Sequence, residues 1–168
     1  MGKKEKPVLN RYTEELATVV CIDQSYTHAG FSVWDLNTAT LLNFTQFGYE
    51  KTWTNKDKRI AQGAAALSLA SMFECNAVIV EEPRMFPSAQ TKARLHEIVA
   101  TVSNMVELPV YMVNTTTWKA ATVGHRASKA ETVQYVLEHF NVTADDDVAD
   151  AICIGEAVGK GVKIKRFF

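Results

Sequence analysis

Two short, uninterrupted apolar runs, each ending in a carboxylate, constrain the fold of this chain more than any other feature. Residues 18–22 (TVVCI) stop at Asp23, and residues 77–80 (AVIV) stop at Glu81. Continuous rather than alternating apolarity is typical of strands buried on both faces. In open α/β sheets, sites form at the carboxyl ends of strands. If the two strands are parallel neighbours, Asp23 and Glu81 are therefore predicted to point into one crevice.

Other patterns place these strands in a mixed sheet. Residues 30–35 and 40–49 look strand-like and, with the first run, predict an antiparallel meander, while residues 110–113 form a third buried run. Helices are predicted over residues 56–74 and 88–106 from helical spacing, from Ser128 to His139 behind a Ser128–Glu131 capping box, and from Asp145 onward. The order β-β-β-α-β-α-β-α-α predicts an α/β fold with a five-stranded mixed sheet and helices on both faces.

Length and composition fit one globular domain. The chain has 168 residues, of which 47% are hydrophobic and 22% charged, ordinary values for such a protein. We expect a flexible segment at 1–16, the folded domain at 17–158 and a basic tail at 159–168. No apolar run approaches the ~18 residues of a membrane span, and the N-terminus is polar, so we expect a cytoplasmic protein. The three cysteines show no metal-ligand spacing.

Charge is distributed unevenly along the chain. The net charge of −1 does not by itself indicate nucleic-acid binding. Local distribution matters more than the sum. Lysines lie near both ends, and Lys119, Arg126 and Lys129 form an interior basic cluster, whereas acids gather at residues 145–147. This separation suits a protein that holds cations in one place and phosphates around it.

The start of the last predicted helix carries two more carboxylates. Asp147 and Asp150 are three residues apart, which puts them on one helical face. Converging with Asp23 and Glu81, they would repel one another strongly unless cations lie between them. Oxygen-only ligands suit Mg²⁺ or Mn²⁺. Two such ions ~4 Å apart form a clamp used in phosphodiester hydrolysis.

Each acid also has a simpler interpretation. Asp23 would be a polar strand end before a turn. Glu81 would be a solvated strand end, with its neighbour Glu82 as the functional residue instead. Acids such as those at 145–147 commonly complement the helix dipole. The combination of acids, rather than any one of them, favours a metal site.

Three motifs resemble the RuvC family of Holliday junction resolvases. They are residues 22–25 with 29–33, the second carboxylate strand at 78–82, and the Asp-x-x-Asp-Ala run at 147–155. The segment from Lys119 to Lys129 looks like the family's basic segment. The resemblance covers residues 18 to about 158, and the order and spacing of the motifs carry it, because each alone is weak.

The resemblance implies an RNase H-like fold, a homodimer, two Mg²⁺ ions, for which Mn²⁺ can substitute, and paired nicks across four-way DNA junctions. We expect no membrane partner, since no apolar run is long enough to span one, and no small-molecule cofactor beyond the metal. The implied metal ligands are Asp23, Glu81, Asp147 and Asp150. Lys119 and Lys129 would contact DNA phosphate or stabilise transition-state charge; a lysine before a helix is also commonly just solvated. Arg126 belongs to the same basic segment.

The loop after Glu81 departs from the bacterial RuvC pattern. The family commonly has an aromatic residue here that enters the junction centre, whereas here 82–86 (EPRMF) intervenes. Phe86 would wedge between bases or belong to the core at a helix start, and Arg84 would contact DNA. The chain resembles phage-encoded RuvC relatives, some of which accept varied branched DNA, and the shifted loop puts strict sequence selectivity in question.

Other functions are compatible with the same motifs. An RNase H-like nuclease acting on flaps or RNA–DNA hybrids would use the same acids. A non-catalytic DNA-binding module is disfavoured, because it has no reason to concentrate negative charge beside phosphates. A sugar kinase of the same superfamily needs two lobes, for which the chain is too short.

Overall fold

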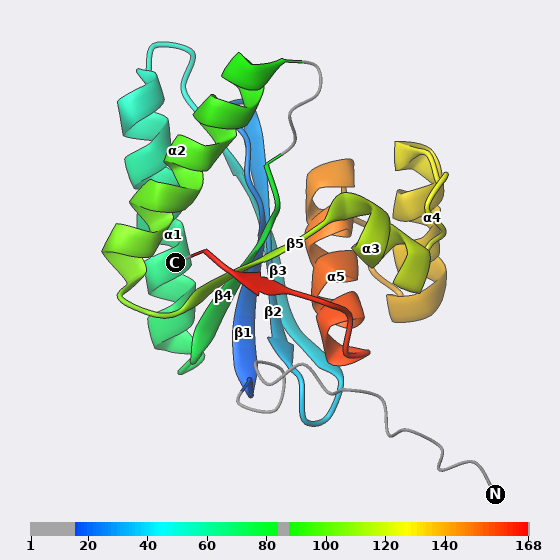
Figure 1. Cartoon of the computed structure of the whole chain (residues 1–168). Helices are drawn as coiled ribbons and strands as arrows, with labels where there is room; N and C mark the ends of the chain where they lie inside the picture. The colour runs from blue at the N-terminus through cyan, green and yellow to red at the C-terminus, as the bar shows by residue number, and fades with distance from the viewer. Residues whose placement is uncertain (1–15, 84–87, 168) are drawn as a thin grey trace, which may run out of the picture.

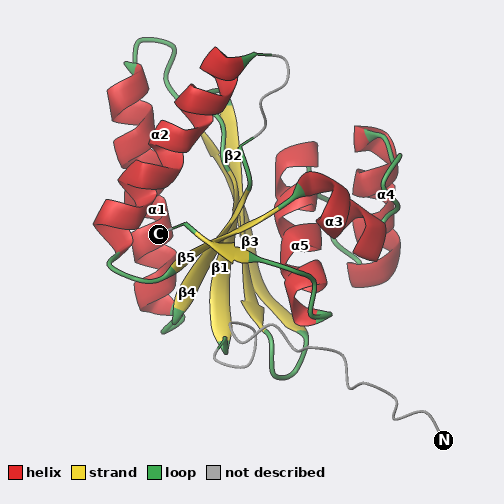
Figure 2. Cartoon of the chain, in the orientation of Figure 1, coloured by secondary structure: helices red, strands yellow, loops and turns green. Residues whose placement is uncertain are grey.

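The fold is a six-stranded mixed sheet with helices on both faces (Figures 1 and 2). The computed structural model describes residues 16–83 and 88–167. Strand order across the sheet is β3-β2-β1-β4-β5-β6. The strands are β1 (Thr18–Asp23), β2 (His28–Asp35), β3 (Thr40–Gly48), β4 (Ala77–Glu81), β5 (Val110–Val113) and β6 (Lys165–Arg166).

Pairing in the sheet confirms the predicted meander and the parallel core. β1 pairs antiparallel with β2, which pairs antiparallel with β3. β1 pairs parallel with β4, and β4 with β5. The parallel strands β1, β4 and β5 therefore end at the same edge of the sheet, toward which β1 and β4 run upward in Figure 1. We call this the active edge.

Within residues 16–83 and 88–167, five helices connect and cover the strands, and their starts follow the capping signals. Asp145 caps the last helix, with its Oδ1 accepting from the Val148 N–H at 2.9 Å. The predicted Ser128–Glu131 capping box is present. The helices are α1 (Asn55–Met72), α2 (Ala89–Val106), α3 (Thr115–Ala121), α4 (Lys129–Phe140) and α5 (Asp146–Gly159).

The five-strand prediction was wrong, and one helix was missed. Lys165–Arg166 adds a sixth strand antiparallel to β5. Both of its residues are exposed, so it has no apolar pattern to reveal it. The missed helix α3 has the sequence TTTWKAA, in which only Thr115 and Trp118 are buried. Seven residues with two buried positions give no helical period.

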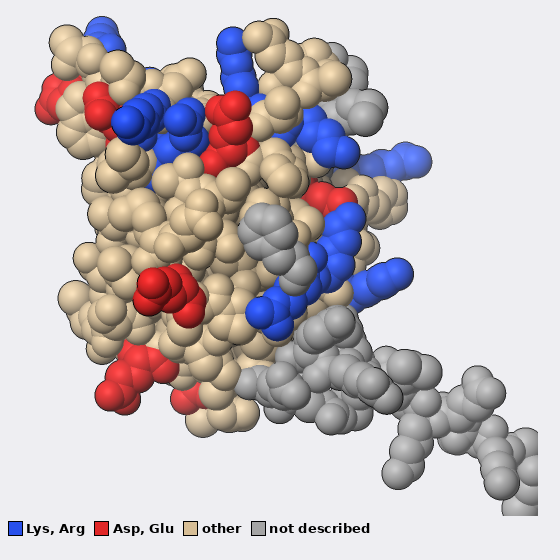
Figure 3. Space-filling view, turned by 60° about the vertical axis from the view of Figure 1, so that its left-hand side comes forward, with Lys and Arg blue, Asp and Glu red and all other residues tan. Residues whose placement is uncertain are grey.

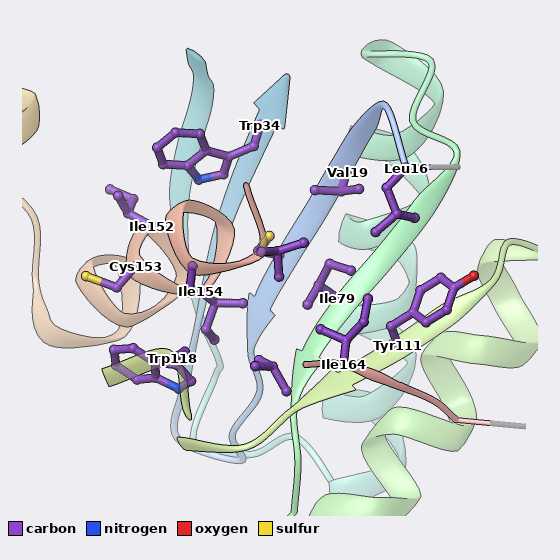
Figure 4. Packing of buried hydrophobic residues seen from close by; sticks show 14 of the residues in the cluster. Leu16, Val19, Trp34, Ile79, Tyr111, Trp118, Ile152, Cys153, Ile154 and Ile164 are labelled. Carbon is purple, nitrogen blue, oxygen red and sulfur yellow. The ribbon is translucent and has the colours of Figure 1, made fainter. Parts of the chain in front are cut away.

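Successive side chains of a strand point to opposite faces of the sheet, so the core is divided into two layers. Val19 and Cys21 of β1 pack toward α5, together with Trp118 of α3 (Figure 4). Val20 and Ile22 pack on the other face, against α1 and α2. All three cysteines are free and buried.

Some expectations fall at the ends of the described chain. The expected flexible segment lies outside the described residues except for Leu16, which is buried in the α5-side core. The expected basic tail carries β6. Among the described residues, no helix is long and apolar enough to cross a membrane.

Candidate active site

The register of β1 and β4 brings Asp23 and Glu81 together. Ile22 lies opposite Val80 in the parallel pair, so the carboxylates follow at neighbouring positions. Side chains alternate between the faces of a strand. Cys21 and Ile79 point into the α5-side core, and the residues two positions further on, Asp23 and Glu81, therefore share that face.

Helix α5 lies along β2 in a matched register. A Cβ on Gly30 would come within 2.1 Å of the Asp147 carbonyl oxygen, and a Cβ on Gly155 within 2.0 Å of the Trp34 ring. Between them, the Ser32 hydroxyl donates to the Ala151 carbonyl at 2.6 Å. Two residues along a strand rise about 6.6 Å, and four along a helix about 6 Å, so the contacts stay in step.

This docking brings the start of α5 to the active edge. Gly30 is the antiparallel partner of Asp23. Because Gly30 has no side chain, the backbone at Asp147 can approach the strand directly beside Asp23. Asp147 and Asp150 are therefore carried to the carboxylates of β1 and β4 by the packing of a whole helix.

The carboxylates are mutually destabilising when ionised. Burial raises the pKa of Asp23 well above its ordinary value, and the charges of Glu81, Asp150 and Asp147 add to the effect. Burial also raises the pKa of Asp150 to about 7, reinforced by the charge of Glu81. These couplings show that the structure brings Asp23, Glu81 and Asp150 within one electrostatic cluster.

Asp147 lies at the rim of this cluster. Burial raises its pKa, as do the neighbouring charges of Asp146 and Asp145, while His28 and Lys129 lower it. His28 begins β2 beside the active edge.

Two polar side chains that the sequence did not single out hold Glu81. The Thr115 hydroxyl donates to Glu81 Oε1, and Gln24 Nε2 donates to the Glu81 carbonyl at 2.6 Å. Both side chains are buried. Thr115 lies two residues beyond the end of β5, at the start of α3, whereas Asp23 and Glu81 are the last residues of their strands. Inspecting every buried strand end, rather than only those with acids, would have found it.

The neighbouring acids have other partners. Glu82 forms an ion pair with Lys165 of β6, so it is engaged away from the cluster. The carboxylate oxygens of Asp145, Asp146 and Asp147 lie within 4.8 Å of one another. Asp145 caps α5, and Asp146 pairs with Lys129 Nζ at 3.4 Å. These contacts support Glu81 over Glu82, and Asp147 over its two neighbours, as candidate ligands.

The predicted basic residues border the cluster to different degrees. Lys119 lowers the pKa of Asp150 by its charge, and its Nζ donates to the Ala127 carbonyl at 3.2 Å. Lys129 is exposed beside Asp146, and Arg126 is exposed. The predicted DNA contacts Arg84 and Phe86 lie outside the described residues.

Charge on the face that α1 and α2 cover is also uneven. Figure 3 shows Lys and Arg concentrated in the upper and right-hand parts of this face, while its centre is largely uncharged. The upper part adjoins the active edge. Acidic side chains also lie in this upper part, so the charge there is mixed.

The donor set fits divalent metal. Asp23, Glu81, Asp147 and Asp150 offer only carboxylate oxygens, the ligands that Mg²⁺ and Mn²⁺ prefer. The raised pKa values of Asp23 and Asp150 show that their negative charge is poorly compensated by the protein. A bound cation would supply that compensation.

Stability of the metal-free protein should therefore fall as pH rises. From about pH 4, where an unfolded Asp titrates, to about pH 7, the folded chain holds more protons than the unfolded chain, because the pKa of Asp150 is raised. We expect the free energy of unfolding to drop on the order of 4 kcal/mol across this window. Thermal unfolding in EDTA at several pH values measures it.

Two comparisons sharpen that experiment. Asp150→Asn should reduce the dependence without abolishing it, because it removes one titrating group while Asp23, whose pKa is also raised, remains. MgCl₂ should raise the melting temperature more at pH 8 than at pH 5, since ionised carboxylates bind the ion. Equal stability of the wild-type protein at both pH values in EDTA would contradict the prediction.

The fold matches solved structures of junction resolvases. Thermus thermophilus RuvC has 22% identity and a TM-score of 0.66, over 88% of this chain and 99% of that one. The same protein in complex with a Holliday junction substrate has 21% identity and a TM-score of 0.69, over 90% and 99%. The yeast mitochondrial Holliday junction resolvase has 12% identity and a TM-score of 0.57, over 95% and 86%.

Comparison of sequences finds no relative, whereas comparison of structures does. No protein-family model and no curated protein matches the sequence. The structural matches span nearly the whole length of both chains. The chain therefore has the RuvC-like RNase H fold that its three acidic motifs led us to expect.

Proposed function

We propose that this protein is a Mg²⁺-dependent, structure-specific endonuclease that resolves Holliday junctions and other branched DNA. It would act as a homodimer in recombination, repair or phage genome processing. One observation carries the proposal: carboxylates from β1, β4 and α5 form one electrostatic cluster at the active edge of a RuvC-like fold. A RuvC of that fold has been solved with a Holliday junction substrate.

Asp23, Glu81, Asp147 and Asp150 would hold two Mg²⁺ ions. When bound, the ions supply an activated water and stabilisation of the leaving oxygen. Thr115 holds the Glu81 carboxylate by its hydroxyl, and the Gln24 contact ties the ends of β1 and β4 together. These contacts limit the movement of Glu81, as preorganised sites require.

Lys119 and Lys129 would bind the DNA backbone beside the carboxylates. Lys119 is within electrostatic reach of Asp150, and Lys129 approaches Asp146. Cations at these positions offset the repulsion between phosphate and the acidic cluster. They would also stabilise negative charge that develops on the scissile phosphate.

A nicking assay on a synthetic four-way junction tests the function. Each strand is labelled in turn, and cut positions are mapped with Mg²⁺ and with EDTA. Two symmetric cuts that need Mg²⁺ are expected, and light scattering should show a dimer. Flaps and RNA–DNA hybrids in parallel reactions identify a different nuclease substrate. Absence of cuts in all substrates would refute the proposal.

A further inference from the structure

A series of three aromatic side chains, Phe47, Tyr49 and Trp53, begins at the end of β3 beside the active edge. The Phe47 and Tyr49 ring centroids are 5.7 Å apart, and those of Tyr49 and Trp53 are 6.2 Å apart. A turn closed by the Trp53 N–H donating to the Glu50 carbonyl at 3.0 Å sets the position of Trp53. The series therefore runs from the sheet to the start of α1.

Tyr49 connects this series to the candidate active site. Its hydroxyl donates to the Ser25 carbonyl at 3.1 Å, two residues beyond Asp23. Gln62, fully buried on α1, donates to the same carbonyl at 2.9 Å. Burial raises the pKa of Tyr49, and the Asp147 charge adds to the effect, so Tyr49 lies within electrostatic reach of α5.

Trp53 is the tryptophan that reaches solvent. Of the three tryptophans, all within the described residues, Trp34 and Trp118 are buried, and Trp53 is partly exposed. A surface hollow of about 290 Å³ lies beside it, lined also by Asp57, Ile60 and Ala61. Its walls are an aromatic ring, an aliphatic side chain that is 42% exposed, and one carboxylate.

The surroundings of the hollow carry positive charge. Lys58 Nζ lies 5.7 Å from the Tyr49 ring centroid and donates to the Tyr26 carbonyl at 3.0 Å. Lys51 and Lys56, on either side of Trp53 in sequence, are exposed. Exposed aromatics interleaved with lysines are the usual surface for unpaired nucleotides, because bases stack on rings while cations follow the phosphates.

We propose that Trp53 and its hollow bind an unpaired nucleobase of the DNA strand that passes the carboxylates. The proposal rests on the proposed function and specifies its substrate: branched DNA with unpaired bases beside the cut. Trp53 supplies the stacking face, and Lys51, Lys56 and Lys58 supply attraction for the adjoining phosphates. Asp57 Oδ2 accepts from the Thr54 N–H, and its second oxygen can accept from a base edge.

Tryptophan fluorescence and DNA binding test the proposal together. The Asp23→Asn protein, intended to be inactive, is titrated with fluorescein-labelled oligothymidylate and, separately, with a four-way junction. Oligothymidylate should quench the exposed tryptophan emission. Trp53→Ala should weaken binding of the oligonucleotide, measured by anisotropy, about five- to one-hundred-fold. Trp53→Phe should retain most of the affinity, because a ring remains.

Matched controls make each outcome decisive. Phe44→Ala removes another exposed aromatic of β3, 42% exposed and outside the series, and should leave binding unchanged. Absence of quenching at saturation, or equal affinity of Trp53→Ala and wild type, would overturn the proposal. So would a fluorescence change that depends on protein concentration alone, which would assign the hollow to a second copy of the chain. Oligothymidylate binding needs no cleavage, so the result is independent of the nicking assay.

Discussion

Asp23→Asn is expected to reduce junction cleavage more than about 100-fold while leaving junction binding intact. The loss should exceed the 10- to 100-fold typical of removing an outer contact of a metal ligand, because Asp23 would be a ligand itself. Asparagine keeps the shape of the side chain and removes one ionised group from a buried acidic cluster. We therefore expect a melting temperature at or above that of wild type in EDTA.

Single-turnover nicking and an electrophoretic binding assay measure the two effects separately. Asp35→Asn is the matched control: Asp35 ends β2 at the opposite edge of the sheet, where its Oδ1 accepts from Asn37 and Thr38 N–H groups. That variant should cut at the wild-type rate. Wild-type cleavage by Asp23→Asn would refute the site assignment.

Gly30→Ala is expected to damage both folding and cleavage. The added Cβ would lie 2.1 Å from the Asp147 carbonyl oxygen and 2.6 Å from the Val148 nitrogen, which are backbone atoms that cannot rotate away. Overpacking a core typically costs 1–3 kcal/mol, and we expect about 3 kcal/mol here. That corresponds to about 6–12 °C in melting temperature. Displacement of α5 would also carry Asp147 and Asp150 away from Asp23.

Gly48→Ala separates this effect from the general cost of altering a strand glycine. Gly48 ends β3, and a Cβ there would meet only His28 Cδ2, at 3.9 Å. We expect a change in melting temperature of no more than about 2 °C and normal cleavage. If Gly30→Ala melts and cuts like wild type, α5 does not owe its position to this close approach.

The sequence by itself was sufficient for the elements that have a strong pattern. β5 was predicted at its observed bounds, and α4 and α5 start at the predicted caps. Burial on both faces makes a strand continuously apolar, and capping requires particular polar side chains, so both leave local signals. The acids that end β1 and β4 could be recognised because each directly follows a continuous apolar run.

Weak or non-local features were not predictable in this way. The sixth strand has two exposed residues, and it exists because an edge of β5 is available to it. Thr115 supports Glu81 only because β5 pairs beside β4. Neither relation is encoded within a few residues of sequence.

The choice among neighbouring acids also depended on the tertiary structure. Strand alternation puts Glu81 on the α5 face, while Glu82 pairs with Lys165 from the far end of the chain. The contacts of Gly30, Ser32 and Gly155 determine the position of α5 along β2. That position in turn determines where Asp150 lies. The sequence determined which carboxylates are available, because strand ends and helix caps are local. Only packing decided which of them meet, because that depends on the register between elements distant in the chain.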